Sequence, residues 1–243
     1  MLTLSAGTIA LVSLGAFIGA VSAGAAGFAF AMTASAIWLH VMDPVRSALL
    51  VVASGGLLHT ILVWRMRATI DRARLAPLLI GGLAGVPIGV ALLTVVDTAL
   101  VRRMLGGLMV AYGGYALLAP SLPRVTAGGR RADAAVGLVG GVMSGLGGYS
   151  GVPATIWAQL RGWPKELARG VYQPFILAMH VSTLVLVGGL TFDRTSALLL
   201  VITLPALLLG GWLGYRLYGH LNERQFRRLL AAMIAASGAA LVI

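Results

Sequence analysis

The fold is decided by the stretch from Ala134 to Trp163, which reads AAVGLVGGVMSGLGGYSGVPATIWAQLRGW. It is apolar, rich in glycine, and too long for one membrane-spanning helix, which needs about 20 predominantly apolar residues. It is also short for two, because halves of about 13 and 11 residues reach only about 20 and 16 Å at 1.5 Å per residue. We therefore predict a re-entrant helical hairpin that returns to the side it left. Two short membrane crossings would place the flanking loops on the same sides as the hairpin does, so they stay an alternative.

A second glycine-broken region, Leu4–Met42, has the same pattern in the same order. Gly15-x-x-x-Gly19-x-x-Ser22 matches Gly137-x-x-x-Gly141-x-x-Ser144. After a shift of one residue in the alignment, Gly24 and Gly27 match Gly145 and Gly148. Further along, Ile37-Trp38 matches Ile156-Trp157. Each region is followed by a basic turn (Asp43–Arg46; Lys165–Arg169), a span with one histidine (His59; His180), and two more spans. The agreement in order across each half indicates an internal duplication.

Composition places the whole chain in a membrane. Hydrophobic residues make up 59% of the 243 residues and charged residues only 10%, against roughly 25% charged in a typical soluble domain. This balance excludes an ordinary soluble enzyme, a disordered tail and a coiled coil. Six further segments are apolar enough to be full spans: Val45–Trp64, Ala76–Val96, Met104–Ala119, Gly170–Leu190, Ser196–Leu217 and Phe226–Ile243. We predict an all-α polytopic membrane protein of two inverted repeats, each a broken helix or re-entrant hairpin followed by three transmembrane helices.

The predicted organisation is a first transmembrane repeat over residues 1–119, a cytoplasmic linker over 120–133 and a second transmembrane repeat over 134–243. The linker contains the turn-forming runs Ser121-Leu122-Pro123 and Gly128-Gly129-Arg130-Arg131. If each hairpin returns to its own side, each half crosses three times and the halves are inverted. Only four of the 18 Lys and Arg residues then lie opposite the others, namely Arg46, Arg102, Arg103 and Arg194. Because cytoplasmic loops carry an excess of Lys and Arg, this arrangement is favoured, with both termini outside the cytoplasm.

The charged residues also narrow the function. We attribute the net charge of +11 to the excess of Lys and Arg in cytoplasmic loops, so no nucleic-acid partner is expected. There is no cysteine, and no His-Glu-x-x-His, Walker or Gly-x-Ser-x-Gly motif, so we expect no metal, no cofactor and no enzymatic activity. The seven acids lie at or beyond segment ends: Asp43, Asp71, Asp97, Asp133, Glu166, Asp193 and Glu223. A cation transporter would be expected to place an acid inside the membrane, so the pattern favours an anionic or neutral substrate.

The glycine-rich breaks are the candidate substrate site. In lipid, a non-helical backbone persists only where protein or a water-filled cavity satisfies its amides. The predicted breaks are Ala23–Gly27 and Gly145–Gly151, and Pro153 suits the first turn of a new helix. A helix N-terminus attracts anions, and glycine lets the backbone approach them closely. The candidate substrate-binding residues are Ser22, Gly24, Gly27, His59, Gly145, Gly147, Gly148, Tyr149, Ser150, Gln173 and His180.

Structural roles compete with these assignments. Glycines at four-residue spacing often serve helix packing, the role favoured for Gly15, Gly19, Gly137 and Gly141. The two histidines could titrate near neutral pH, which would allow proton coupling, or could be neutral and join helices by a hydrogen bond. Arg46 and Arg169 are expected to set topology or anchor helices at the headgroups rather than to guide substrate.

The glycine series of the second half continues as Gly145-x-Gly147-Gly148-x-x-Gly151-Val152-Pro153. The penultimate spans of the halves carry Gly82-x-Ala84-Gly85-Val86-Pro87-x-Gly89 and Pro205-x-x-x-x-Gly210-Gly211-x-x-Gly214. Together with the matches above, this pattern resembles the sulfite exporter TauE/SafE family of bacterial membrane proteins. The first repeat departs from it, with Ala26-Gly27 and no proline where the second has Gly147-Gly148 and Pro153.

The resemblance implies a secondary transporter of the bacterial inner (plasma) membrane that exports small sulfur-containing oxyanions such as sulfite or organosulfonates. We expect alternating access, with the anion bound at the glycine-rich hairpin tips. An anion channel, a transporter of another small organic anion and a non-transporting membrane scaffold stay as alternatives. The expected partners are the small anionic substrate and the lipid bilayer. A coupling proton or cation and association as a homodimer stay open.

Overall fold

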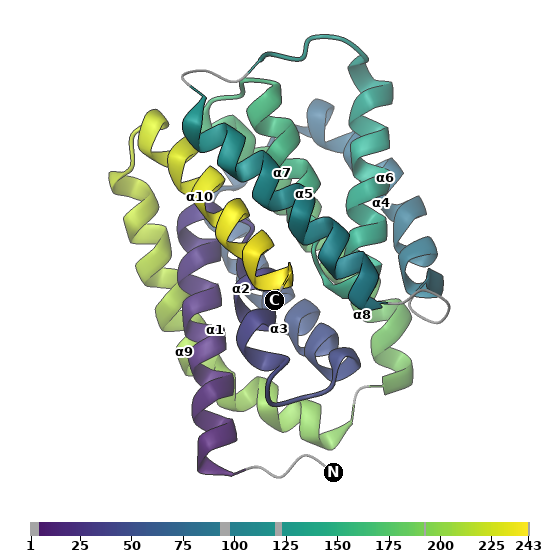
Figure 1. The fold of residues 1–243 in the computed structure, drawn as a ribbon, viewed down its shortest axis with the longest axis vertical. Coiled ribbons are helices and arrows are strands. Elements are labelled where there is room, and N and C mark those ends of the chain that lie inside the picture. Colours follow the sequence, from purple (N-terminus) through teal and green to yellow (C-terminus); the bar gives the residue numbers. More distant parts are fainter. Residues whose placement is uncertain (1–4, 93–97, 120–122, 192, 243) are drawn as a thin grey trace.

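The computed structural model describes residues 5–92, 98–119, 123–191 and 193–242, and the described residues form ten α-helices without a strand (Figure 1). The helices are α1 (Ala6–Ala26), α2 (Phe30–Trp38), α3 (Pro44–Arg65), α4 (Arg72–Leu92), α5 (Thr98–Leu118), α6 (Gly129–Gly147), α7 (Gly151–Leu160), α8 (Lys165–Thr191), α9 (Arg194–His220) and α10 (Glu223–Val242), with a short 3-10 turn, η1 (Arg67–Thr69), after α3. Of the described helices, α1, α3, α4, α8 and α9 are long and apolar enough to cross a membrane. Large apolar side chains cover the outside, with Ile80 70% and Val185 73% exposed, as a lipid-facing surface requires. The prediction of an all-α polytopic membrane protein is confirmed.

Several helices begin earlier than their apolar stretches suggest. α4 begins at Arg72 instead of Ala76, and α8 at Lys165 instead of Gly170, so the predicted basic turn Lys165–Arg169 is helical. α6 begins at Gly129, which makes the last five residues of the predicted linker helical. The apolar pattern misses these turns because the ends of membrane helices extend into the polar interface, where charged residues are favoured. The ends of the predicted segments at 93–96, 120–122 and 243 lie outside the described residues.

Aspartates explain where three helices begin. Asp43, Asp71 and Asp193 each accept a hydrogen bond from the backbone N–H three residues later, at 2.9, 3.0 and 2.8 Å. This is the usual N-terminal cap of a helix. The bonds from Ser196 hold the pKa of Asp193 below its ordinary value, and nearby Arg46 contributes to the same shift. Acids at segment ends therefore have a structural task in this chain.

Both glycine-broken regions are helical hairpins with one long and one short arm. In the first, α2 returns along α1, so that a Cβ on Gly19 would lie 3.0 Å from the Phe30 ring. The breaks span only residues 27–29 and 148–150, shorter than the predicted Ala23–Gly27 and Gly145–Gly151. The helices end at Gly27 and Gly148, which have φ values of 89° and 80°. Only these two glycines of the predicted breaks need the left-handed conformation, and the preceding ones remain helical.

A tryptophan closes each hairpin at corresponding places. The Trp38 indole N–H donates to the carbonyl oxygen of Val12 at 2.9 Å, which joins α2 to α1. The Trp157 indole N–H donates to Oδ1 of Asp133 at 2.8 Å, which joins α7 to α6. The Ile-Trp match therefore marks, in each half, a bond from the short arm to the long arm, to a backbone carbonyl in the first half and to a carboxylate in the second.

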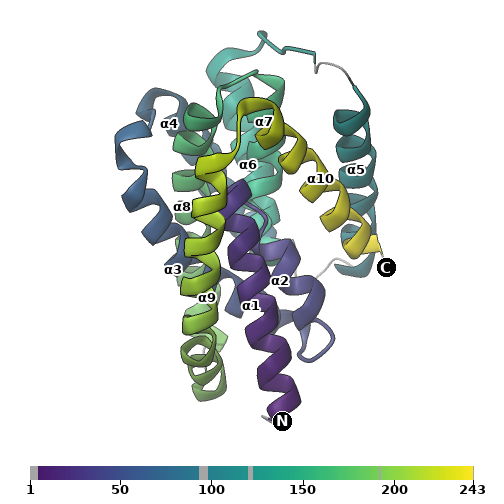
Figure 2. The same ribbon diagram turned by 90° about the vertical axis from the view of Figure 1, so that its left-hand side faces the viewer.

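The helices pair across the two halves through glycine. α1 packs along α9 in the same direction, with Phe17 against Gly210 and Val21 against Gly214. α6 packs along α4 in the same way, with Leu138 against Gly85 and other contacts further along. α5 packs against α10, and α3 against α8 (Figure 2). Such close approach of backbones is the usual role of small residues in membrane helices.

The ends of the central pair, α3 and α8, show that these helices run in opposite directions. At one end, Arg46 near the start of α3 forms an ion pair of 3.0 Å with Asp193, just after α8. At the other end, Gly170 near the start of α8 lies against the backbone of Thr69, just after α3. This second end also holds Lys165, whose Nζ donates to the carbonyl oxygen of Leu221 at 2.6 Å. The pair forms the core around which both hairpins fold.

Candidate functional site

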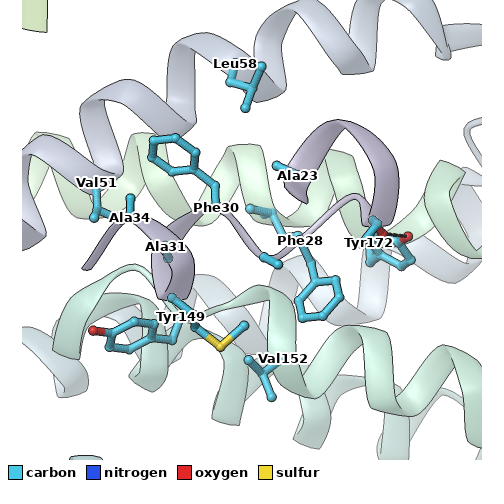
Figure 3. Packing of buried hydrophobic residues seen from close by; sticks show 14 of the residues in the cluster. Ala23, Phe28, Phe30, Ala31, Ala34, Val51, Leu58, Tyr149, Val152 and Tyr172 are labelled. Atoms are coloured by element: carbon cyan, nitrogen blue, oxygen red, sulfur yellow. Dashed lines mark hydrogen bonds between the residues drawn. The ribbon is translucent and has the colours of Figure 1, made fainter. Parts of the chain in front are cut away.

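The tips of the two hairpins meet inside the bundle. A Cβ on Gly151, the first residue of α7, would lie 2.8 Å from Cβ of Phe28 in the first tip. Figure 3 shows Phe28 lying over the segment that carries Tyr149 and Val152. Two breaks that are 121 residues apart in the chain therefore form one place in the fold.

Each tip also lies on the central helix of the opposite half. A Cβ on Gly27 would lie 2.6 Å from the Tyr172 ring of α8, whose hydroxyl donates to the carbonyl oxygen of Ala26 at 2.6 Å (Figure 3). A Cβ on Gly148 would lie 2.8 Å from a methyl group of Val51 on α3. The positions of the two tips are thus fixed by α8 and α3.

Backbone N–H groups at the tips are used to end the helices. The N–H of Gly148 donates to the carbonyl oxygen of Ser144 at 2.7 Å, and that of Tyr149 to Met143 at 3.1 Å. The N–H of Gly27 donates to Ala23 at 2.7 Å. This is the common way to satisfy the last carbonyls of a helix. The amides of Gly27, Gly148 and Tyr149, which end the long arms, are therefore engaged within the protein.

Four of the predicted site residues lie in packed surroundings on the long arms. A Cβ on Gly24 would lie 2.7 Å from the carbonyl oxygen of Gly211 in α9. A Cβ on Gly145 would lie 2.6 Å from the backbone nitrogen of Val90 in α4, and one on Gly147 would lie 2.5 Å from the Tyr149 ring. Ser22 is 8% exposed within α1. These three glycines therefore pack against neighbouring helices or against the tip itself.

Three other predicted residues are completely buried with unused hydrogen-bonding groups. Ser150 in the second break, Gln173 on α8 and His59 on α3 are each 0% exposed. Within the described parts of the chain, neither Oγ of Ser150, nor the amide of Gln173, nor either ring nitrogen of His59 has a hydrogen-bond partner. A buried polar group without a partner costs about 1–3 kcal/mol. Such groups close to a helix break are therefore candidates for contact with a ligand.

The two histidines meet in the core. The rings of His59 and His180 lie edge to face with centroids 5.6 Å apart. His180 Nε2 donates to the carbonyl oxygen of Gly148 at 3.1 Å, so this histidine joins α8 to the second tip as a neutral or charged donor. Gly55 allows this approach, because a Cβ there would lie 2.6 Å from Cε1 of His180. The pair links the tip to both central helices.

Arg169 is a candidate that sequence reasoning placed elsewhere. It is 0% exposed, so its side chain is enclosed by the protein and does not reach the lipid headgroups, which was one of the two roles expected of it. Its guanidinium carbon is 4.0 Å above the Tyr218 ring and 5.9 Å above that of Tyr215. No guanidinium nitrogen has a hydrogen-bond partner among the residues that the structure describes. The sequence does contain one signal for a role at the site. Arg169 precedes Gln173 by four residues, which places both side chains on one face of α8.

The acids have other engagements. Asp43, Asp71 and Asp193 cap helices, Asp133 pairs with Arg161 at 3.1 Å, Glu223 accepts from the backbone N–H of Lys165 at 3.0 Å, and Glu166 lies 3.6 Å from Nζ of Lys165. Asp97 lies outside the described residues. Across those that are described, no three or more His, Cys, Asp or Glu side chains come together as metal ligands. The unpartnered groups of Ser150, Gln173 and His59 can donate as well as accept hydrogen bonds, and their donors suit an anion or a polar neutral molecule.

The long apolar helices define a multi-pass membrane protein. The family model for the sulfite exporter TauE/SafE matches residues 11–241, so the chain belongs to this family. The family is one of membrane transporters for sulfite or related anions. Comparison with curated proteins and with solved structures gave no match.

Proposed function

We propose that the protein is a secondary transporter that exports sulfite, an organosulfonate or a related small sulfur oxyanion across the bacterial inner membrane. The observation that carries this proposal is the set of completely buried, unpartnered polar side chains at Ser150, Gln173 and His59. An oxyanion has several acceptor oxygens and would satisfy the donors that the protein leaves unpaired. Acids at helix ends, away from the tips, fit a negatively charged substrate.

Side chains rather than glycine amides form the proposed binding site. The Ser150 hydroxyl, the Gln173 amide and the His59 ring would donate to the anion, while His180 holds the second tip through Gly148. Gly27 and Gly148 shape the tips by ending the long arms. Ser22, Gly24, Gly145 and Gly147 would support the site through packing, and Tyr149 through its place in the second tip.

We further propose that the two halves are inverted repeats and alternate access by moving against each other. In support, α1 packs with α9 as α6 packs with α4, and α3 runs opposite to α8. A site between repeats, formed by broken helices, is a recurring design of secondary transporters. The end that holds Arg161, Lys165 and Arg169 would face the cytoplasm, following the excess of cationic residues there.

Thermal unfolding of the detergent-purified protein tests the site. We expect sulfite or an organosulfonate to raise the melting temperature, since a ligand at 100 times its Kd stabilises by about 2.7 kcal/mol. Ser150→Ala should reduce this response without unfolding the protein. Ser182→Ala is the matched control, because its hydroxyl donates within α8 to Ala178 at 2.8 Å. No response to any sulfur oxyanion, or an unchanged response in Ser150→Ala, would overturn the assignment.

Flux into proteoliposomes tests the mechanism. A transporter that alternates between two states has a saturable rate, because each turnover requires a conformational change. We therefore expect sulfite flux to saturate and to be slowed by Ser150→Ala. Flux that rises linearly with concentration and carries current would identify an anion channel instead.

A further inference from the structure

We propose that Arg169 forms a second oxyanion-binding site, on the cytoplasmic side of the hairpin tips. The proposal rests on the proposed transport of an anion and adds a second position at which the anion binds during transport. Its starting point is a complete guanidinium group, 0% exposed, without a hydrogen-bond partner in any of the described segments. A buried, unpaired charge is among the most costly features of a folded protein. Pairing with a ligand would account for such a group.

Two aromatic rings lie beside the guanidinium of Arg169, and none of its nitrogens has a hydrogen-bond partner among the described residues. The Tyr218 ring lies 4.0 Å from the guanidinium carbon and the Tyr215 ring 5.9 Å. Stacking on aromatic rings stabilises the charge through the ring faces. It provides no acceptors for the five N–H groups that point outward in the guanidinium plane. Two oxygens of one sulfite or sulfonate group match this edge in the bidentate manner known for arginine.

A neighbouring arginine shows what a structural arginine looks like in this fold. Arg161 lies at the same end of the bundle and donates to Asp133 at 3.1 Å and to the carbonyl oxygens of Val125 and Gly129, each at 3.2 Å. Its charge is paired and its donors are used. Arg169 is more deeply buried, and among the described residues its charge is unpaired and its donors are unused. The acids near the start of α8 are held by Lys165, with Glu166 54% exposed.

The position of Arg169 on α8 connects it to the central site. Gln173 follows four residues later and His180 eleven residues later, so the three side chains share one face of the helix. All three are at most 1% exposed. Arg65, on the surface at the end of α3, lies 5.5 Å from the Tyr215 ring that also contacts Arg169. A route from the surface through Arg169 to Gln173 and the tips would hold donors along its length.

The decisive variant is Arg169→Met, which keeps an unbranched side chain and removes the charge. Replacing buried charge with an apolar group is often neutral or stabilising. We therefore expect the melting temperature without anion to be unchanged or raised. The KM for sulfite flux should rise at least tenfold, and isothermal titration with sulfite should lose one of two binding events. Arg224→Met, which removes an exposed charge from the start of α10 at the same end, should leave KM and binding unchanged.

The outcomes separate this site from the central one. If wild-type protein binds sulfite with two events and Arg169→Met retains both, the second site is wrong while the central site stands. If the wild type binds no sulfur oxyanion at all, the proposed function itself fails. If Arg169→Met does not fold, Arg169→Lys decides, because lysine keeps the charge without the bidentate edge. A raised KM in Arg169→Lys supports the site, and a wild-type KM overturns it.

Discussion

Gly55 and Gly56 are neighbours on α3 with opposite surroundings, and the pair tests the role of His180. A Cβ on Gly55 would lie 2.6 Å from Cε1 and 2.7 Å from Nδ1 of His180, whereas a Cβ on Gly56 would meet nothing within 4 Å. Gly55→Ala should push the imidazole away from the carbonyl oxygen of Gly148 and disturb the second tip. We expect a loss of about 1–3 kcal/mol of stability, the usual cost of overpacking, and a weaker thermal response to sulfite.

Gly56→Ala is the matched control for that substitution. Alanine is favoured over glycine in a helix by up to about 1 kcal/mol, so the melting temperature should stay the same or rise. Flux and the sulfite response should be those of the wild type. Equal effects of the two alanines would show that the His180 contact does not position the tip.

At the scale of single residues, sequence reasoning singled out some of the buried polar groups but not their surroundings. Ser150, Gln173 and His59 were predicted from their polarity within apolar stretches, and the structure buries all three. Arg169 was expected to set topology or to anchor a helix at the headgroups, because it lies near the start of a span. Its burial depends on the Tyr215 and Tyr218 rings of α9, more than 40 residues away in the chain, and local sequence carries no signal for such a contact.

At the scale of elements, the α5–α10 pair gives a second matched test. A Cβ on Gly113 would lie 2.6 Å from the backbone nitrogen of Ala235 and 2.7 Å from the carbonyl oxygen of Ala231 in α10, whereas Gly114 has nothing within 4 Å. Gly113→Ala should force the two helices apart and lower the free energy of unfolding by about 1–3 kcal/mol. Thermal unfolding measures the loss.

The comparison with Gly114→Ala makes that result specific. This variant should unfold at or slightly above the wild-type temperature. Because α5 and α10 pair with each other rather than with the central helices, the sulfite Kd should be unchanged in both variants. A large change in affinity in Gly113→Ala would mean that this peripheral pair takes part in the site.

The elements themselves were largely predictable, because apolar length and glycine spacing are local properties. Ten segments and two hairpins follow from the pattern, and they are present. The position of each break was less predictable. Gly24 and Gly145 read as breaks in sequence but are helical, since their missing side chains admit the backbones of α9 and α4. Which glycine packs and which turns the chain depends on the neighbouring helix.

At the scale of the whole molecule, the proposal of inverted repeats predicts on which side of the membrane each hairpin begins. Ser5 caps the start of α1, accepting from the backbone N–H of Thr8 at 3.1 Å. Thr126 lies just before α6, 121 residues later, and both are exposed. If the halves are inverted, these two positions, each just before the long arm of a hairpin, face opposite sides of the membrane, with Thr126 in the cytoplasm.

The sequence contains no cysteine, so a single introduced thiol reports its own location. In intact cells, a membrane-impermeant maleimide should label Ser5→Cys at once and Thr126→Cys only after the membrane is permeabilised. His220→Cys, on an exposed residue at the end of α9, should behave like Thr126→Cys, since Lys165 joins that region to the start of α8. Labelling of Ser5→Cys and Thr126→Cys from the same side would require parallel repeats. Each hairpin would then cross the membrane once, and the cationic residues would divide almost evenly between its two sides, against the usual cytoplasmic excess.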